Sequence, residues 1–144
     1  IVLGDGRVTI QDQPEGAFDL LLIDAFSSDS VPAHLITREA LQVYFSRLSE
    51  DGVIVFHISN RHLALNKVLA RIAEAEGVVA RYQDFKTPLE RSPEVTSSQV
   101  AILARSDVAF ARLEGDARWE PLVSDGARPW SDDYTNIIGA MIEH

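Results

Sequence analysis

The sequence of 144 residues contains no cysteine. This absence excludes disulfide bonds and thiolate zinc sites, and it is typical of a protein in a reducing compartment. No apolar run approaches the roughly 20 residues of a membrane-spanning helix. The first residues lack the basic segment and apolar core of a signal peptide. We therefore expect a cytoplasmic protein, or the soluble domain of a membrane-anchored parent, with no direct membrane contact from this segment.

Basic residues are also scarce, since 13 Lys and Arg stand against 22 Asp and Glu and the net charge is −9. This excess of acidic residues argues against a protein that binds the phosphates of nucleic acid, so we expect no nucleic-acid partner. It favours a small cationic ligand, although the same charge also serves solubility alone.

Several site motifs are missing as well. There is no Gly-x-Gly-x-x-Gly and no phosphate-binding loop, so a claim of nucleotide-phosphate binding has no support here. Ser27 and Ser28 lack the glycines of a nucleophile elbow, which argues against a serine hydrolase. No metal is expected, because the four histidines have no metal-ligand spacing; they are His34, His57, His62 and His144.

The most informative stretch runs from residue 18 to residue 30. Residues 18–24 form an apolar run between turn-forming residues, which predicts a strand buried on both faces of a parallel sheet. Asp24 lies at its end, and Asp29 lies in the serine-rich loop that follows. Ligands of open parallel sheets bind outside the carboxyl ends of the strands, so both acids are candidates for a site. The alternative is that Asp24 caps a loop or the next helix.

The remaining pattern predicts an α/β domain over residues 1–144. Residues 1–3 are expected to end a strand and residues 4–7 to form a turn, in which Asp5 bonds a ligand or its own backbone. The other expected elements are helices over 38–49, 61–76 and 107–113, and strands over 53–58, 78–82 and 97–104. Thr37 and Gly77 are expected to cap two of these helices. The order predicts a Rossmann-like, mostly parallel sheet with flanking helices and an antiparallel edge hairpin.

Three segments together resemble the spermidine synthase-like proteins, which are polyamine aminopropyltransferases on the class I S-adenosylmethionine-dependent methyltransferase fold. The segments are residues 4–7 (GDGR), 18–29 (FDLLLIDAFSSD) and 130–134 (WSDDY). The resemblance keeps their order and spacing over most of the chain. It is closest to the branch often fused to membrane-spanning segments.

The resemblance implies roles for the residues that match. Asp5 and Gly6 resemble the turn that contacts the adenine of the nucleoside cosubstrate. Asp24 resembles the catalytic aspartate after the fourth strand, and Asp29 resembles the second acid, which holds the amine. His57 stands where the polyamine enzymes tend to carry glutamine. The two acids are five positions apart here, whereas the family usually has them three apart.

The late segment is implied to close over the polyamine. Tyr134 and the acids before it, Asp132 and Asp133, resemble the residues that do so. For the two acids, a solvated acidic turn is the alternative reading.

The resemblance also implies a reaction. A carboxylate accepts a proton from a polyamine such as putrescine, and the amine displaces the thioether of decarboxylated S-adenosylmethionine, without a metal. Alternatives are a small-molecule methyltransferase that uses S-adenosylmethionine, and a non-catalytic remnant or soluble module of a membrane protein.

The resemblance places the glycine-rich cosubstrate loop and the first strands upstream of Ile1. We therefore expect residues 1–144 to be the C-terminal part of a spermidine synthase-like domain, inactive by itself. The strand over 18–24 would then present an open edge, so we expect a homo-oligomer.

Overall fold

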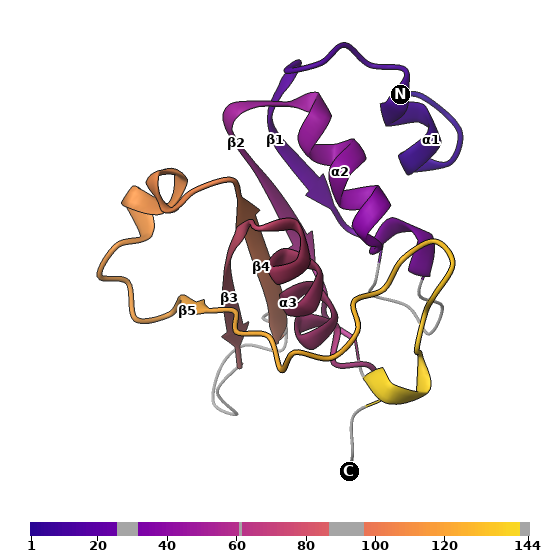
Figure 1. The fold of residues 1–144 in the computed structure, drawn as a ribbon. Helices are drawn as coiled ribbons and strands as arrows, with labels where there is room; N and C mark the ends of the chain where they lie inside the picture. Colours follow the sequence, from indigo (N-terminus) through magenta and orange to yellow (C-terminus); the bar gives the residue numbers. More distant parts are fainter. Residues whose placement is uncertain (26–31, 61, 87–96, 142–144) are drawn as a thin grey trace.

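The computed structural model describes residues 1–25, 32–60, 62–86 and 97–141. These residues form an α/β fold with one five-stranded sheet flanked by helices, which confirms the predicted fold class (Figure 1). The strands are β1 (Phe18–Ile23), β2 (Leu48–His57), β3 (Val79–Phe85), β4 (Ser98–Ala104) and β5 (Glu120–Pro121). The helices are α1 (Gly6–Gln11), α2 (Arg38–Arg47) and α3 (Leu65–Glu76), with 3-10 turns η1 (Ala33–Leu35), η2 (Asp107–Leu113) and η3 (Ile138–Ala140). Among the described residues, no helix has the length and apolar character to cross a membrane.

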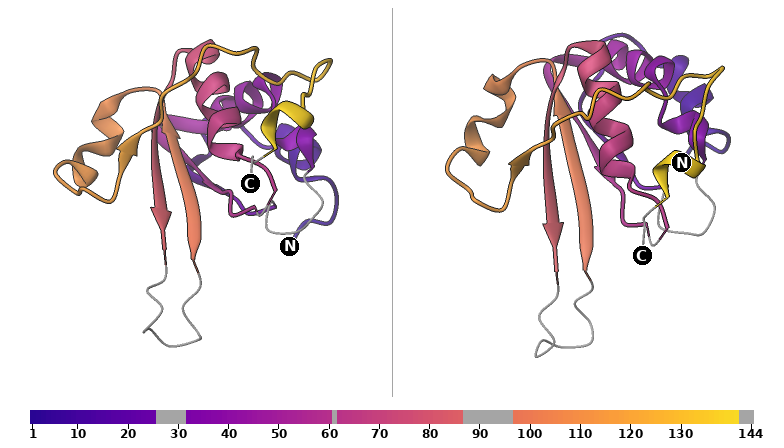
Figure 2. Two further views of the ribbon diagram at one scale, coloured as in Figure 1. Left: turned by 90° about the horizontal axis from the view of Figure 1, so that it is seen from below. Right: turned by 60° about the horizontal axis from the view of Figure 1, so that its bottom comes forward.

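The strand order is β1-β2-β4-β3-β5. β1 pairs in parallel with β2, whereas β4 runs antiparallel to both β2 and β3. Three strands, β1, β2 and β3, therefore run in one direction. Because β4 lies antiparallel between β2 and β3, and β5 is antiparallel to β3, the described sheet is mixed rather than mostly parallel as predicted. The expected hairpin of β3 and β4 is present, with β4 placed between β2 and β3. Figure 2 shows α3 on one side of this hairpin and the segment of η2 and β5 on the other.

The first predicted long helix is confirmed as α2, and its start is fixed by Thr37. The Thr37 hydroxyl accepts the backbone N–H of Ala40 at 3.2 Å, as an N-cap does. The helix ends at Arg47, two residues before the predicted end, because Leu48 is already extended and begins β2.

The second predicted long helix begins later than expected, at Leu65 rather than residue 61. The side chain of Asn60 accepts the N–H groups of His62 and Leu63, both at 2.9 Å. This local turn satisfies the backbone donors without a helix. The predicted C-terminal cap is confirmed, since Gly77 has a φ of 65°.

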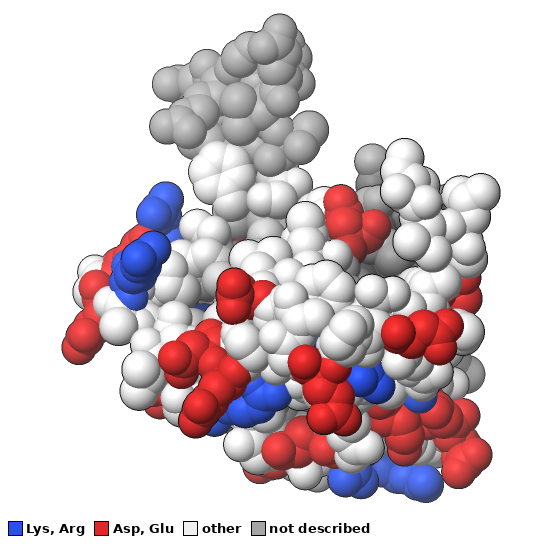
Figure 3. All heavy atoms as spheres, turned by 90° about the horizontal axis from the view of Figure 1, so that it is seen from above, with Lys and Arg blue, Asp and Glu red and all other residues white. Residues whose placement is uncertain are grey.

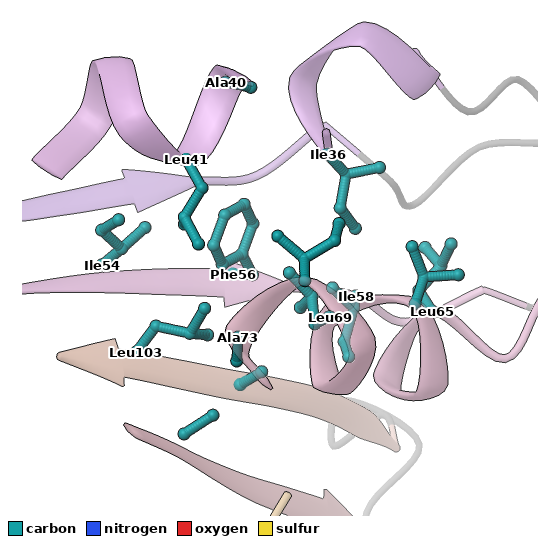
Figure 4. Packing of buried hydrophobic residues seen from close by; sticks show 14 of the residues in the cluster. Ile36, Ala40, Leu41, Ile54, Phe56, Ile58, Leu65, Leu69, Ala73 and Leu103 are labelled. Carbon is teal, nitrogen blue, oxygen red and sulfur yellow. The ribbon is translucent and has the colours of Figure 1, made fainter. Parts of the chain in front are cut away.

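The hydrophobic core lies between α2 and α3 and one face of the sheet (Figure 4). Leu41 of α2 and Leu69 of α3 point toward Ile54, Phe56 and Leu103 of the sheet. All five side chains are at most 2% exposed. α2 and α3 therefore cover the same face of the sheet.

β1 differs from the prediction of a strand buried on both faces. Leu21 faces the helices and is buried, but Leu20 and Leu22 are 54% and 61% exposed. The reason is that β1 is the edge strand of the described sheet, and alternate side chains point away from α2 and α3. The prediction of two-sided burial is therefore wrong for the described residues.

The beginning of the chain also differs from the prediction. Residues 1–3 have no regular structure and are exposed, so they do not end a strand. The expected turn at residues 4–7 is instead the start of α1. The Asp5 carboxylate accepts the N–H groups of Arg7 and Val8 and caps this helix. α1 packs against α2 and does not pair with β1.

Candidate active site

Asp24 and His57 meet at the carboxyl ends of β1 and β2. The parallel register pairs Ile23 with Phe56, so the next residues of the two strands lie side by side. Oδ1 of Asp24 is 2.7 Å from Nδ1 of His57. Sequence reasoning selected these two residues separately, and the structure brings them together. Their position outside the strand ends is where ligands bind in open sheets of this kind.

A third residue, Ser59, extends this pair. Oγ of Ser59 is 2.8 Å from Nε2 of His57, and the same oxygen accepts the backbone N–H of Gln99 at 2.8 Å. Sequence reasoning missed Ser59. The available signal was its spacing, because residues two apart in an extended segment point to the same side.

The Asp24 carboxylate remains accessible although it is bonded. Its side chain is 55% exposed, whereas that of His57 is 29% exposed. The imidazole is therefore the more enclosed partner, and the carboxylate is the one that a ligand can approach. Asp29, the second acid of the expected pair, lies outside the described residues.

Asp5 and Gly6, the predicted cosubstrate turn, lie at the start of α1. Oδ2 of Asp5 is 2.7 Å from Nε2 of His34, and Oδ1 caps the helix. The N–H of Val8 and the contact with His34 lower the pKa of the Asp5 carboxyl, which favours its charged form. The place where a Cβ would stand on Gly6 is open space.

The carboxylate of Asp132 forms hydrogen bonds with two other side chains of the chain. Arg7 donates to its two oxygens at 2.6 and 2.7 Å, and the Thr37 hydroxyl lies 2.8 Å from Oδ1. The hydrogen bonds from Arg7 lower the pKa of the Asp132 carboxyl. Asp132 therefore connects the start of α1 and the cap of α2 to the late segment of the chain.

Residues 131–134 form a tight turn. Ser131 and Tyr134 exchange backbone hydrogen bonds of 2.8 and 3.0 Å, and Asp133 is exposed in the turn between them. The guanidinium of Arg128 lies 4.0 Å from the centre of the Tyr134 ring, as in a cation–π contact. The roles implied for Asp133 and Tyr134 stay predictions.

Charge by itself does not mark a site. Acidic side chains are spread over the face shown in Figure 3, with basic side chains between them. Within the part of the chain that the structure describes, no group of three or more His, Cys, Asp or Glu could hold a metal ion. The candidate site is therefore defined by the contacts of Asp24 and His57.

The chain is similar to several known proteins, although no family model matches it. It is 31% identical over 113 residues to the polyamine aminopropyltransferase of Vibrio vulnificus (strain CMCP6), covering 77% of this chain and 37% of that protein. The structure of a probable spermidine synthase from Corynebacterium glutamicum superposes with a TM-score of 0.60 at 17% identity, over 94% of this chain and 55% of the other. The structure of a SAM dependent methyltransferase from Archaeoglobus fulgidus superposes with a TM-score of 0.50 at 16% identity, over 73% of this chain and 66% of the other.

The fold is therefore that of the class I S-adenosylmethionine-dependent methyltransferases. The chain is similar in sequence to the polyamine aminopropyltransferase and in fold to the probable spermidine synthase, in agreement with the resemblance that its three sequence segments carry. The chain spans 37% of the length of the curated relative that it matches.

Proposed function

We propose that the protein carrying this chain transfers an aminopropyl group from decarboxylated S-adenosylmethionine to a small cationic amine such as putrescine. The observation that carries this proposal is the contact of 2.7 Å between Asp24 and His57 at the ends of two parallel strands. The name of the Vibrio relative, a polyamine aminopropyltransferase, supports the same reaction.

Asp24 is the proposed proton acceptor. His57 engages Oδ1, so we assign Oδ2 to the attacking amine. The amine must lose a proton, and a carboxylate at hydrogen-bond distance accepts it. The nitrogen forms a bond to the aminopropyl carbon, the bond from that carbon to sulfur breaks, and the electron pair stays on sulfur as a neutral thioether. The protein contributes position and charge compensation.

Other residues are assigned to binding. We assign the contact with the adenine to Asp5 and Gly6 at the start of α1, where the resemblance implies it. Asp132 already accepts hydrogen bonds from Arg7 and Thr37, so we assign the ammonium contact of the late segment to Asp133 and Tyr134.

The test compares Asp24→Asn with the unchanged protein, using the complete natural chain that contains these residues. Putrescine is supplied with either decarboxylated or intact S-adenosylmethionine. We expect aminopropyl transfer to fall about 10²- to 10⁴-fold in the variant, without loss of folding. Asp19→Asn is the control, because Asp19 is a carboxylate of the same strand that accepts a hydrogen bond from Ser49.

Four outcomes would contradict the proposal. Asp24→Asn could retain a near-full rate, or it could lose activity merely by unfolding. Methyl transfer from intact S-adenosylmethionine would instead support the methyltransferase alternative, and no transfer from either form would support a non-catalytic protein.

A further inference from the structure

A continuous chain of hydrogen bonds connects the backbone of β4 to the carboxylate that follows β1. The N–H of Gln99 lies 2.8 Å from Oγ of Ser59, which lies 2.8 Å from Nε2 of His57. Nδ1 of His57 in turn lies 2.7 Å from Asp24. The exposed carboxylate is thereby tied, through two side chains, to the middle of the sheet.

The donors and acceptors along this chain are compatible with a neutral His57, and this is the arrangement that we assign. Oγ of Ser59 accepts from Gln99, so its own hydrogen is available to donate to Nε2 of His57. The Asp24 carboxylate can only accept a hydrogen bond, so we place the imidazole hydrogen on Nδ1 of His57, which donates to it. His57 is then neutral, with one nitrogen accepting and the other donating.

The consequence concerns the orientation of Asp24. A carboxylate at the end of a strand loses rotamer freedom when it is held, and this ordering costs free energy that a neighbour must offset. The His57 ring can hold it only if the ring itself is fixed, and Ser59 fixes the ring from the opposite nitrogen. Ser59 is part-buried and acts from behind His57, on the side away from the carboxylate.

We propose that Ser59 is a positioning residue, which holds the Asp24 carboxylate in its reactive orientation through His57. This inference rests on the proposed aminopropyl transfer. It assigns a function to a residue that neither the sequence motifs nor the resemblance selected.

The same three residue types occur in serine hydrolases, where the serine is the nucleophile. Here Oγ of Ser59 accepts a hydrogen bond from Gln99, which draws electron density away from the oxygen that would attack. We therefore assign Ser59 to positioning. Covalent labelling of Ser59 by a fluorophosphonate probe would overturn this assignment.

The kinetic test uses the complete natural protein and two variants of Ser59. We expect Ser59→Ala to lower kcat roughly 10- to 100-fold with little change in KM, because the misplaced carboxylate still binds the amine. Ser59→Thr keeps the hydroxyl and should restore most of the rate. Ser49→Ala is the matched control, because Ser49 lies at the other end of β2 and also donates to a carboxylate, that of Asp19.

A double-variant cycle separates positioning from general support of the fold. If Ser59 acts through Asp24, Ser59→Ala should cost little further rate when Asp24→Asn is already present. A purely structural role predicts that the two losses multiply. Multiplying losses, or an unchanged kcat in Ser59→Ala, would overturn the proposal.

A second readout does not depend on activity. Nitrogen NMR of histidine-labelled protein, assigned with His57→Gln, should show Nδ1 of His57 protonated and Nε2 unprotonated. Ser59→Ala should shift the Nε2 signal. Two protonated nitrogens, a hydrogen on Nε2, or no response to Ser59→Ala would overturn the assignment, whether or not aminopropyl transfer is found. Absence of transfer with the expected spectrum would instead count against the proposed function alone.

Discussion

Arg7 and Asp132 lie 125 positions apart and form two parallel hydrogen bonds of 2.6 and 2.7 Å. Arg7 also donates to the backbone oxygen of His34 at 3.0 Å. The beginning of the chain is thereby connected to the late segment that the resemblance implies in substrate binding. The position of that segment therefore depends on a guanidinium at the start of α1.

Arg7→Gln should therefore lower the free energy of unfolding. A two-bonded arginine–carboxylate pair is worth more than a neutral hydrogen bond, but Asp132 is 43% exposed and solvent screens the pair. We expect a loss of about 1 kcal/mol, measured by urea unfolding of the complete protein. Arg118→Gln is the control, because Arg118 pairs with Asp116 two residues away and connects no distant segments. Equal losses in the two variants would contradict the prediction.

The same pair predicts a dependence of stability on pH. Arg7 lowers the pKa of the Asp132 carboxyl, so the folded state favours the charged form. The stabilisation is fully present above the unfolded carboxyl pKa of about 4, and it is lost as the pH falls through the lower folded value. Unfolding measured at a series of pH values should show the difference between the unchanged protein and Arg7→Gln shrinking below about pH 4. A constant difference would argue against this linkage.

The buried hydroxyl of Tyr44 should make the free energy of unfolding depend on pH in the alkaline range. Burial raises the pKa of its hydroxyl to about 12. The neutral form is favoured in the folded state, so this stability is present below the unfolded pKa of about 10 and is lost as the pH rises toward 12. Ultraviolet titration should show delayed ionisation, and Tyr44→Phe should make stability fall less steeply in this range. Identical slopes for the two proteins would contradict the prediction.

Local patterns predicted much of the fold. The predicted helix over 38–49 corresponds to α2, Thr37 marks its start, and Gly77 marks the end of α3, because each of these features depends on residues close in sequence. The exposure of Leu20 did not follow from sequence, since an apolar run looks the same in a central strand and an edge strand. That difference depends on which strands and helices pack beside β1.

The candidate site was predictable in part for the same reason. Asp24 was selected from its place at a strand end and from the resemblance, and His57 from the resemblance alone. The parallel register then explains their contact. Ser59 was not selected, because its role depends on β4 lying beside β2 and presenting Gln99. The ion pair of Asp132 was missed because Arg7 is remote in sequence.

The loss of activity on substitution of His57 should depend on whether the new side chain can donate a hydrogen bond to Asp24. The amide of His57→Gln can still donate a hydrogen bond to Asp24, whereas the side chain of His57→Leu cannot. We expect the leucine variant to lose about tenfold more activity than the glutamine variant, because the carboxylate is no longer held. Steady-state kinetics of both variants in the complete protein, with melting temperatures as a control for folding, decide this. Equal losses in both would contradict a donor role for His57.

β1 is an open edge of the described sheet. When the 144-residue chain is produced alone, we expect it to self-associate through this strand, because Leu20 and Leu22 are exposed and an unblocked edge is a template for pairing. The segment over residues 1–9 could have covered the edge, but it does not pair with β1: residues 6–9 belong to α1, which packs against α2. Pairing of two copies would be two-fold symmetric, the commonest closed arrangement.

Light scattering of this chain and of Leu20→Lys with Leu22→Lys tests the prediction. The lysines place charge on an edge strand, which opposes pairing, and both positions are exposed, so the core packing of Leu21 is kept. Val108→Lys is the control, because Val108 is a 74% exposed residue of η2, away from β1. We expect the double variant to be monomeric and the control to associate like the unchanged chain. An unchanged chain that stays monomeric at all concentrations would show that the β1 edge does not drive association.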